Sequence, residues 1–237
     1  MLRFFRIIRK QLMEQNNIRT YLLYAIGEIA LVMIGILLAL QVNNWNEERK
    51  ARTFENEILS LIDQNLQNDS VQLSRELSKA KQAIELTDRL IEEVDQENYS
   101  DSLNYWMGKI ISFERFKSQT SAFEVLKARG IETVTNKELQ LTLISYYDEN
   151  IFGVYQSLTD VEKSFNQDWV PVIKEKFSDF KWRDYHQPTD PENFFEDPST
   201  IVLFRIYQDN REAGLDKLED ALVKNAEIRE LIKNRLQ

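Results

Sequence analysis

Residues 21–40 read YLLYAIGEIALVMIGILLAL, an apolar run with one charged side chain, Glu28. As an α-helix, twenty residues are roughly 30 Å long, which is the thickness of the hydrocarbon core of a bilayer. We therefore predict one transmembrane helix over residues 21–42. A cleaved signal peptide has a shorter apolar core, of about 7–15 residues, and a small-residue cleavage site. Here the run passes into Gln41-Val42-Asn43-Asn44-Trp45 instead, which favours an uncleaved signal anchor.

The basic residues on either side of this run predict its orientation. Five of them, against the single acidic Glu14, lie within residues 1–20, and three more lie within residues 49–52. Because Lys and Arg are enriched on the cytoplasmic side of a membrane helix, we expect a cytoplasmic N-terminus. Residues 43–237 then form an extracytoplasmic domain, in a chain with a net charge of −9.

The two ends of the predicted helix carry the residue types that favour membrane interfaces. Residues 1–14 mix apolar and basic side chains, which predicts a short amphipathic segment on an anionic leaflet. Tyr and Trp prefer the headgroup level because their rings are amphipathic. The predicted interface anchors are Arg3, Arg6, Arg9, Lys10, Tyr21, Tyr24 and Trp45.

One face of the helix combines small side chains with the glutamate. The residues of this face, called the stripe below, are Ala25, Glu28, Val32, Gly35 and Ala39. Small residues let a second helix approach closely, and a polar group in lipid needs a protected face. Three hypotheses for Glu28 follow: a ring of glutamates lining a pore, a protonated carboxyl group bonded to a neighbouring helix, or a carboxylate that reaches the cytoplasmic headgroups. The cost of an intramembrane carboxylate favours packing over a pore.

Several segments resemble an uncharacterised family of small membrane proteins from Bacteroidota. The segments that carry this resemblance are Phe4-Phe5-Arg6, residues 24–29 (YAIGEI), 34–47 (IGILLALQVNNWNE), 121–127 (SAFEVLK), 136–139 (NKEL) and Tyr146-Tyr147. The resemblance is most specific over residues 21–48. It implies a bacterial inner-membrane protein with a periplasmic C-terminal domain, and it implies no activity.

The remainder of the chain is predicted to be helical almost throughout. From Leu73 to Val94 the apolar positions follow three- and four-residue steps, a heptad-like seam that faces either a second copy or the domain's own core. The second alternative is favoured because several helices follow. The predicted fold class is all-α, a transmembrane helix and then a helical bundle with a long membrane-proximal helix.

Local signals place the boundaries of the later helices. Tyr99-Ser100-Asp101 should break the long helix, and Gly130 should end a helix that starts near Ser118. Thr135 and Glu138 match a capping box, and Pro171 should end or kink the helix that follows. Three prolines predict a loop over residues 181–199 before a last helix from about 200 to 236.

The sequence contains no recognisable catalytic constellation. It has no Cys, one His (His186), and neither a phosphate-binding glycine loop nor a G-x-S-x-G motif. Acidic residues around His186 do not match an EF-hand, so we expect no metal and no cofactor. The acidic surface argues against nucleic acid.

These absences favour a non-enzymatic protein, an interaction or accessory component that self-assembles in the inner membrane. The alternatives are a ligand-sensing bundle and an oligomeric pore that uses Glu28. The expected partners are the lipid bilayer and a second copy or another membrane protein.

Overall fold

The structure is a computed structural model that describes residues 18–237. The interface anchors Arg3, Arg6, Arg9 and Lys10, and the side chain of Tyr21, lie outside the described residues. The chain divides into two units, Met1–Phe54 and Glu55–Gln237, which are described separately. One long helix, α2 (Ile18–Asp95), contributes residues to both units.

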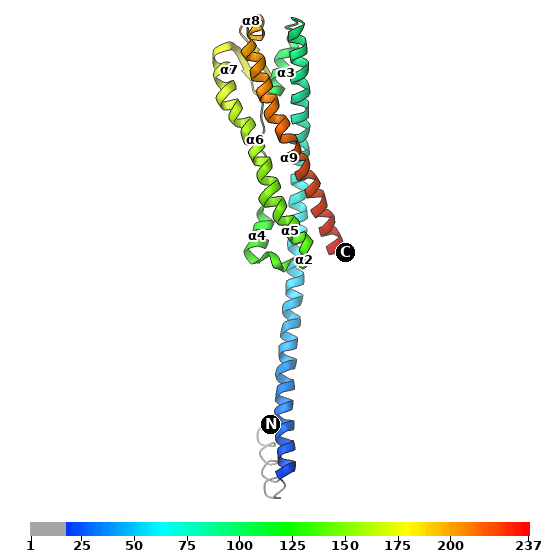
Figure 1. Ribbon diagram of the computed structural model, residues 1–237. Coiled ribbons are helices and arrows are strands. Elements are labelled where there is room, and N and C mark those ends of the chain that lie inside the picture. Colours follow the sequence, from blue (N-terminus) through cyan, green and yellow to red (C-terminus); the bar gives the residue numbers. More distant parts are fainter. Residues whose placement is uncertain (1–17) are drawn as a thin grey trace. The chain divides into compact units, whose positions relative to one another are not determined.

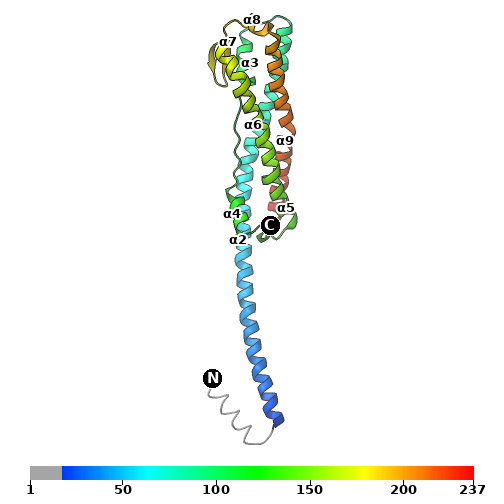
Figure 2. The same cartoon turned by 60° about the vertical axis from the view of Figure 1, so that its left-hand side comes forward.

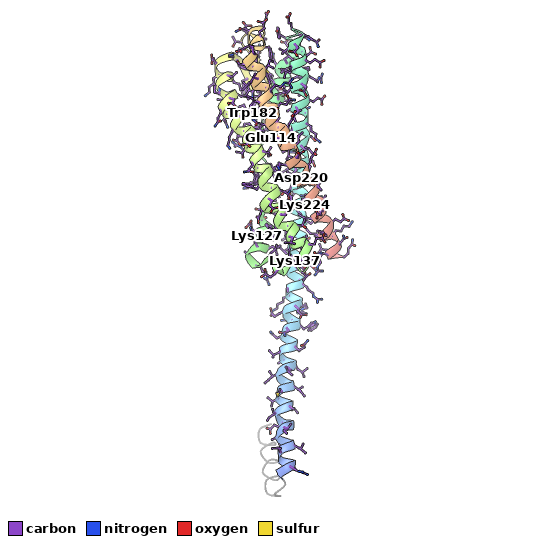
Figure 3. All side chains as sticks on the ribbon, in the orientation of Figure 1. Glu114, Lys127, Lys137, Trp182, Asp220 and Lys224 are labelled. Atoms are coloured by element: carbon purple, nitrogen blue, oxygen red, sulfur yellow. The ribbon has the colours of Figure 1, made fainter. Side chains whose placement is uncertain are left out.

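The first unit contains the apolar part of α2. Every residue from 29 to 45 is exposed, so no other described part of the chain covers this segment, and its side chains project on all sides (Figure 3). Within the described residues, α2 is the one helix that is long and apolar enough to cross a membrane. The expected long apolar N-terminal helix is therefore present.

The second unit is mostly helical (Figure 1). After α2, its α-helices are α3 (Ser102–Ile110), α4 (Ser121–Arg129), α5 (Lys137–Ser145), α6 (Ile151–Ser164), α7 (Val170–Lys176), α8 (Pro191–Glu196) and α9 (Pro198–Leu236). Between them lie a 3-10 turn, η1 (Ile131–Thr133), two π-helical turns, η2 (Tyr146–Asn150) and η3 (Phe165–Trp169), and two strands, β1 (Phe177–Lys181) and β2 (Tyr185–Pro188).

Helix α9 lies beside residues 55–95 of α2, and α6 packs against α9 in the middle of this unit (Figures 1 and 2). Polar contacts tie α2 to α9 at intervals, as the pairs Arg205–Asp88, Lys81–Glu219, Arg229–Asp63 and Arg235–Glu55 show. The α2 number falls as the α9 number rises, so the two helices are antiparallel. Helices α3, α7 and α8 lie at one end of the unit, and α4 and α5 lie at the other (Figures 1 and 2).

The heptad-like seam of α2 faces the core of its own unit. Leu73, Ala80, Thr87, Ile91 and Val94 are all buried. Ile91 and Val94, with the fully buried Leu90, belong to a hydrophobic cluster that also contains side chains of α3, η3, α8 and α9. The alternative that we favoured, intramolecular packing, is confirmed within this chain.

Several predicted boundaries are confirmed. Helix α2 ends at Asp95 and α3 begins at Ser102, as the Tyr99-Ser100-Asp101 signal indicates. Gly130 follows α4 with a φ of 111°, a conformation that favours glycine. Helix α9 ends at Leu236, as predicted.

The prediction for Pro171 is wrong in part, because the helix continues through it. The π-helical turn η3 directly precedes α7, and Pro171 lies in the first turn of α7. The π-helical turn already interrupts the regular i→i−4 hydrogen bonds at this point, so the missing N–H of proline is tolerated there. The wider turn also buries Trp169, whose ring meets Phe204 edge-on at 4.8 Å.

The prediction of a loop over residues 181–199 is also wrong. Most of this range forms the β1–β2 hairpin and helix α8. Pro191 and Pro198 each start a helix, and Asp190 and Asp197 cap those helices by accepting backbone N–H groups. The proline and acidic residues are helix-start signals here, so the unit is mostly helical with one small sheet.

The predicted capping box is wrong by one residue. The side chain of Asn136, and not Thr135, accepts the backbone N–H of Leu139 at 3.0 Å. Thr135 instead donates its N–H and its hydroxyl to Glu55, at 2.8 and 3.0 Å. Thr135 is therefore held by a long-range partner, and Asn136, which is a stronger N-cap residue than threonine, caps the helix.

Candidate functional site

The stripe predicted from the sequence lies on α2 within the first unit. Val32, Gly35 and Ala39 are exposed, and Ala25 and Glu28 are half-buried. A Cβ atom added at Gly35 would meet no atom within 4 Å, so this position has room for a close neighbour. Of the described aromatic anchors, Tyr24 is half-buried and Trp45 is 65% exposed.

A cavity of about 310 Å³ lies in the second unit, in the middle of the bundle. Its walls come from α2, α3 with the segment that follows it, α6, the β1–β2 turn and α9. Gly214 of α9 lets two of these walls meet, because a Cβ atom there would lie 3.1 Å from the Cβ atom of Ser157 on α6. The sequence analysis did not predict this cavity.

Arg211 of α9 is the most buried cation of the cavity wall. Its Nη2 donates to the carbonyl oxygen of Ile110 at 3.0 Å and to that of Ser112, and its guanidinium carbon lies 5.1 Å from the centre of the Tyr207 ring. Burial lowers the pKa of Arg211, whereas Tyr207 and Glu76 act in the opposite direction. The buried Nε of Arg211 has no hydrogen-bond partner in the described part of the chain.

Three of the other charged side chains of the cavity form a network around Glu114. The fourth, Lys109, donates to the backbone carbonyl oxygen of Arg183 at 2.9 Å. Lys79 and Arg183 both donate to Glu114, the second at 2.8 Å. Lys79 also lies 3.9 Å from Glu76, whose pKa is raised by burial against the opposing charge of Lys79. Glu114 and Trp182 lie close to each other on this part of the bundle (Figure 3), where the Trp182 ring meets Phe113 edge-on.

A second buried polar network surrounds Asp69 of α2. This carboxylate accepts hydrogen bonds from the Ser118 hydroxyl, the Gln119 N–H (2.9 Å) and the Tyr146 hydroxyl (3.4 Å). Asn225 of α9 donates to Tyr146 at 3.1 Å, which ties η2 to α9. Burial raises the pKa of Asp69 although its hydrogen bonds lower it. The network cross-links four chain segments, α2, the segment before α4, η2 and α9.

His186 is fully buried in the β1–β2 hairpin. Its ring stacks on Phe180 at 4.3 Å and meets Phe177 edge-on at 6.4 Å, and neither ring nitrogen has a hydrogen-bond partner among the described residues. Burial lowers the pKa of His186 from 6.5 to about 4. The histidine is therefore neutral at pH 7 and packs as an aromatic side chain.

The acidic residues near His186 in the sequence do not gather into one site. Asp184 pairs with Lys181 at 2.6 Å, and Asp190 and Asp197 cap helices. Among the residues that the structure describes, no group of three or more His, Asp or Glu side chains is arranged to hold a metal ion.

By its fold, the chain is in the class of proteins in which a long apolar N-terminal helix is followed in the sequence by a mostly helical bundle. The chain belongs to a family of unknown function, DUF6090, whose family model matches residues 28–168. No curated protein and no solved structure matches the chain.

The sequence carried one local signal for the cavity, the Tyr207–Arg211 pair at i and i+4 on one helix face. The carbonyl groups that hold Arg211 lie about one hundred residues earlier in the chain, and nothing in the spacing of residues points to them.

Proposed function

We propose that this protein is a non-enzymatic, single-pass protein of a bacterial inner membrane that acts as a self-assembling or accessory component. Its N-terminus is cytoplasmic and residues 43–237 are periplasmic in this proposal. The observation that carries it is the apolar segment of α2, in which every residue from 29 to 45 is exposed. Such a surface is unfavourable in water, and a helix satisfies its own backbone hydrogen bonds in lipid.

The stripe supports contact with another helix inside the membrane. It places Gly35 and Ala39 on the same face as Glu28, and small residues at a helix interface allow the backbones to approach. An intramembrane carboxyl group is stabilised when it faces a neighbouring helix. The partner that fits this surface best is a second copy, because each copy presents the same small and polar face.

Paired substitutions of equal size test this proposal. Ala39→Leu changes the last residue of the stripe, which lies in the middle of this face when the helix is viewed along its axis. Ala30→Leu changes the opposite face, roughly 180° around the helix. Both positions are exposed, so neither change disturbs the fold of one copy. Gly35→Leu is a second variant on the stripe, since an added Cβ atom meets nothing within 4 Å there, and Ala30→Leu, roughly 140° away around the helix, is its control too.

The measurement is native mass spectrometry of the full-length protein, extracted gently from its own membrane. We expect an oligomer that Ala39→Leu and Gly35→Leu weaken and that Ala30→Leu leaves intact. Equal assembly of all three variants would refute the role of the stripe. A monomer in every case, including the unchanged protein, would refute self-assembly, whereas a complex with a different protein supports the accessory role.

The pore hypothesis also requires an oligomer, but in it Glu28 lines an ion path, whereas in the packing hypothesis Glu28 contacts a neighbouring helix. It requires ion flux in liposomes that Glu28→Gln abolishes. An oligomer without such flux leaves packing as the role of this residue.

A second candidate function, ligand sensing by the bundle, is favoured by the cavity at Arg211. Its volume of about 310 Å³ falls at the lower end of the range of small-molecule sites, roughly 300–1,000 Å³. Six charged side chains and several apolar ones share the walls, so the cavity offers both kinds of contact to a ligand.

A further inference from the structure

We infer that the cavity of the second unit binds a small organic anion with one or two carboxylate groups, which Arg211 recognises. This inference rests on the second candidate function, that the bundle binds a ligand, and does not depend on self-association. Four observations carry it: an unpaired buried donor, the sign of the wall charges, the apolar part of the wall, and the volume.

The unpaired donor is the Nε–H group of Arg211. Burying a polar group without a hydrogen bond is costly, and the cost is greater for a charged group. The Nη2 atom of this side chain is satisfied by the carbonyl oxygens of Ile110 and Ser112, which fix the guanidinium in place. The buried Nε has no acceptor in the described part of the chain, so an acceptor from a ligand would complete the arrangement.

The charges around the cavity favour an anion. Four basic side chains line it (Lys79, Lys109, Arg183 and Arg211), whereas two acidic ones do (Glu76 and Glu114). This excess of positive charge lies within a chain whose net charge is −9, so it is opposite in sign to the protein as a whole. Glu114 is already engaged by Lys79 and Arg183, and a cationic ligand would have to approach the buried guanidinium.

The remaining walls favour an organic ligand of small size. Phe113, Leu158 and Val161 give the cavity an apolar side, which suits carbon atoms between or beside the charged groups. A guanidinium presents its donors in a plane that matches the two oxygens of a carboxylate. Inorganic phosphate offers similar oxygens and no apolar part, and it serves as the comparison.

The test is isothermal titration calorimetry on the full-length protein in detergent at constant ionic strength. The probes are acetate, succinate and citrate, with the neutral diamide of succinate and inorganic phosphate as controls. We expect at least one of the three carboxylates to bind, and to bind more tightly than the diamide and phosphate.

Two variants locate the site. Arg211→Gln should weaken carboxylate binding about tenfold or more, because it removes a charged donor. Arg205→Gln is the matched control on the same helix, since Arg205 pairs with Asp88 and does not line the cavity. Leu158→Trp adds bulk to the cavity wall from α6 and leaves Arg211 and its carbonyl partners in the sequence unchanged, so it should weaken binding even if Arg211→Gln fails to fold.

The possible results separate the two ideas. Carboxylate binding that survives both Arg211→Gln and Leu158→Trp overturns the site, and phosphate binding in place of carboxylates overturns the organic class. Binding of the neutral diamide alone overturns the claim that the ligand is an anion, and it remains consistent with ligand sensing by the bundle. If no probe binds, the inference is overturned, while self-association is still decided by the Ala39→Leu and Ala30→Leu pair.

Discussion

Acid should destabilise the second unit through His186, and the size of the effect follows from its burial. The pKa of His186 is about 4 in the folded protein and 6.5 as its ordinary value. The folded state therefore binds fewer protons than the unfolded state between these values, so stability is fully present above pH 6.5 and is lost as the pH falls towards 4. The whole shift corresponds to about 3 kcal/mol, of which about 2 kcal/mol is lost between pH 7.5 and 5.

The matched variant is His186→Phe. The ring of His186 stacks on Phe180 and has no hydrogen bond to lose, so phenylalanine keeps the aromatic packing and removes two unpaired nitrogen atoms. We expect this variant to be at least as stable as the unchanged protein at pH 7.5. It should be more stable at pH 5 by about 2 kcal/mol beyond any difference at pH 7.5.

The assay is urea unfolding of both full-length proteins at several pH values, followed by far-UV circular dichroism in detergent. Asp69 and Glu76, whose pKa values are raised by burial, change stability in the opposite direction, since they gain stability as the pH falls. These groups are the same in both proteins, so the difference between the two curves isolates His186. A difference that does not change between pH 7.5 and 5 would refute the argument.

Two further predictions concern packing and a buried ion pair, and both are measured by urea unfolding at pH 7.5. Gly108→Ala should lower the free energy of unfolding by about 3 kcal/mol or more, because its Cβ atom would lie 2.2 Å from the carbonyl oxygen of Asp184. The control Gly153→Ala on α6 makes only ordinary contact and should raise the free energy of unfolding by about 0.5–1 kcal/mol. Equal effects of the two changes would contradict the close approach of α3 to the hairpin. Arg235→Ala should cost about 3 kcal/mol, because it leaves the carboxylate of Glu55, 1% exposed, without its cation; a loss below about 1 kcal/mol would show that the pair behaves like a surface salt bridge.

The regular parts of the fold could be predicted because their signals are local. The seam of α2 from Leu73 to Val94 repeats at helical spacing, and most of its positions are buried in the second unit, whereas Leu77 and Ile84 are half-buried. Gly130 ends a helix through its own backbone conformation. Signals of this kind need only a few neighbouring residues, so they can be found without the fold.

The hairpin and the cavity could not be predicted, because distant residues decide them. Strand β2 lies against α3, where Gly108 allows the backbone of Asp184 to approach, and no local pattern marks that pairing. Prolines at 191 and 198 favoured a loop, although each is also a normal first residue of a helix. The sequence does not distinguish Arg211 from an exposed arginine, because its partners, the carbonyl groups of Ile110 and Ser112, are known only from the structure.

The extent of the family match bears on where a binding function can lie. The match covers residues 28–168, which contain residues 28–40 of the apolar run of α2 and the helices from α3 to α6. It stops before α9, which donates to α2 through Asn225 and Arg229 and covers its buried side. Residues 28–168 are therefore not a complete folding unit in this chain, because the buried face of α2 would lose its antiparallel partner.

The same boundary divides the cavity. Glu76, Lys79 and Glu114 lie within the matched residues, whereas Arg183 and Arg211 lie beyond them. The two acidic side chains thus come from the matched part, and the most buried cation comes from α9. Within the matched residues, the two basic side chains of the cavity, Lys79 and Lys109, balance its two acidic ones. The excess of positive charge therefore comes from Arg183 and Arg211, which the hairpin turn and α9 add.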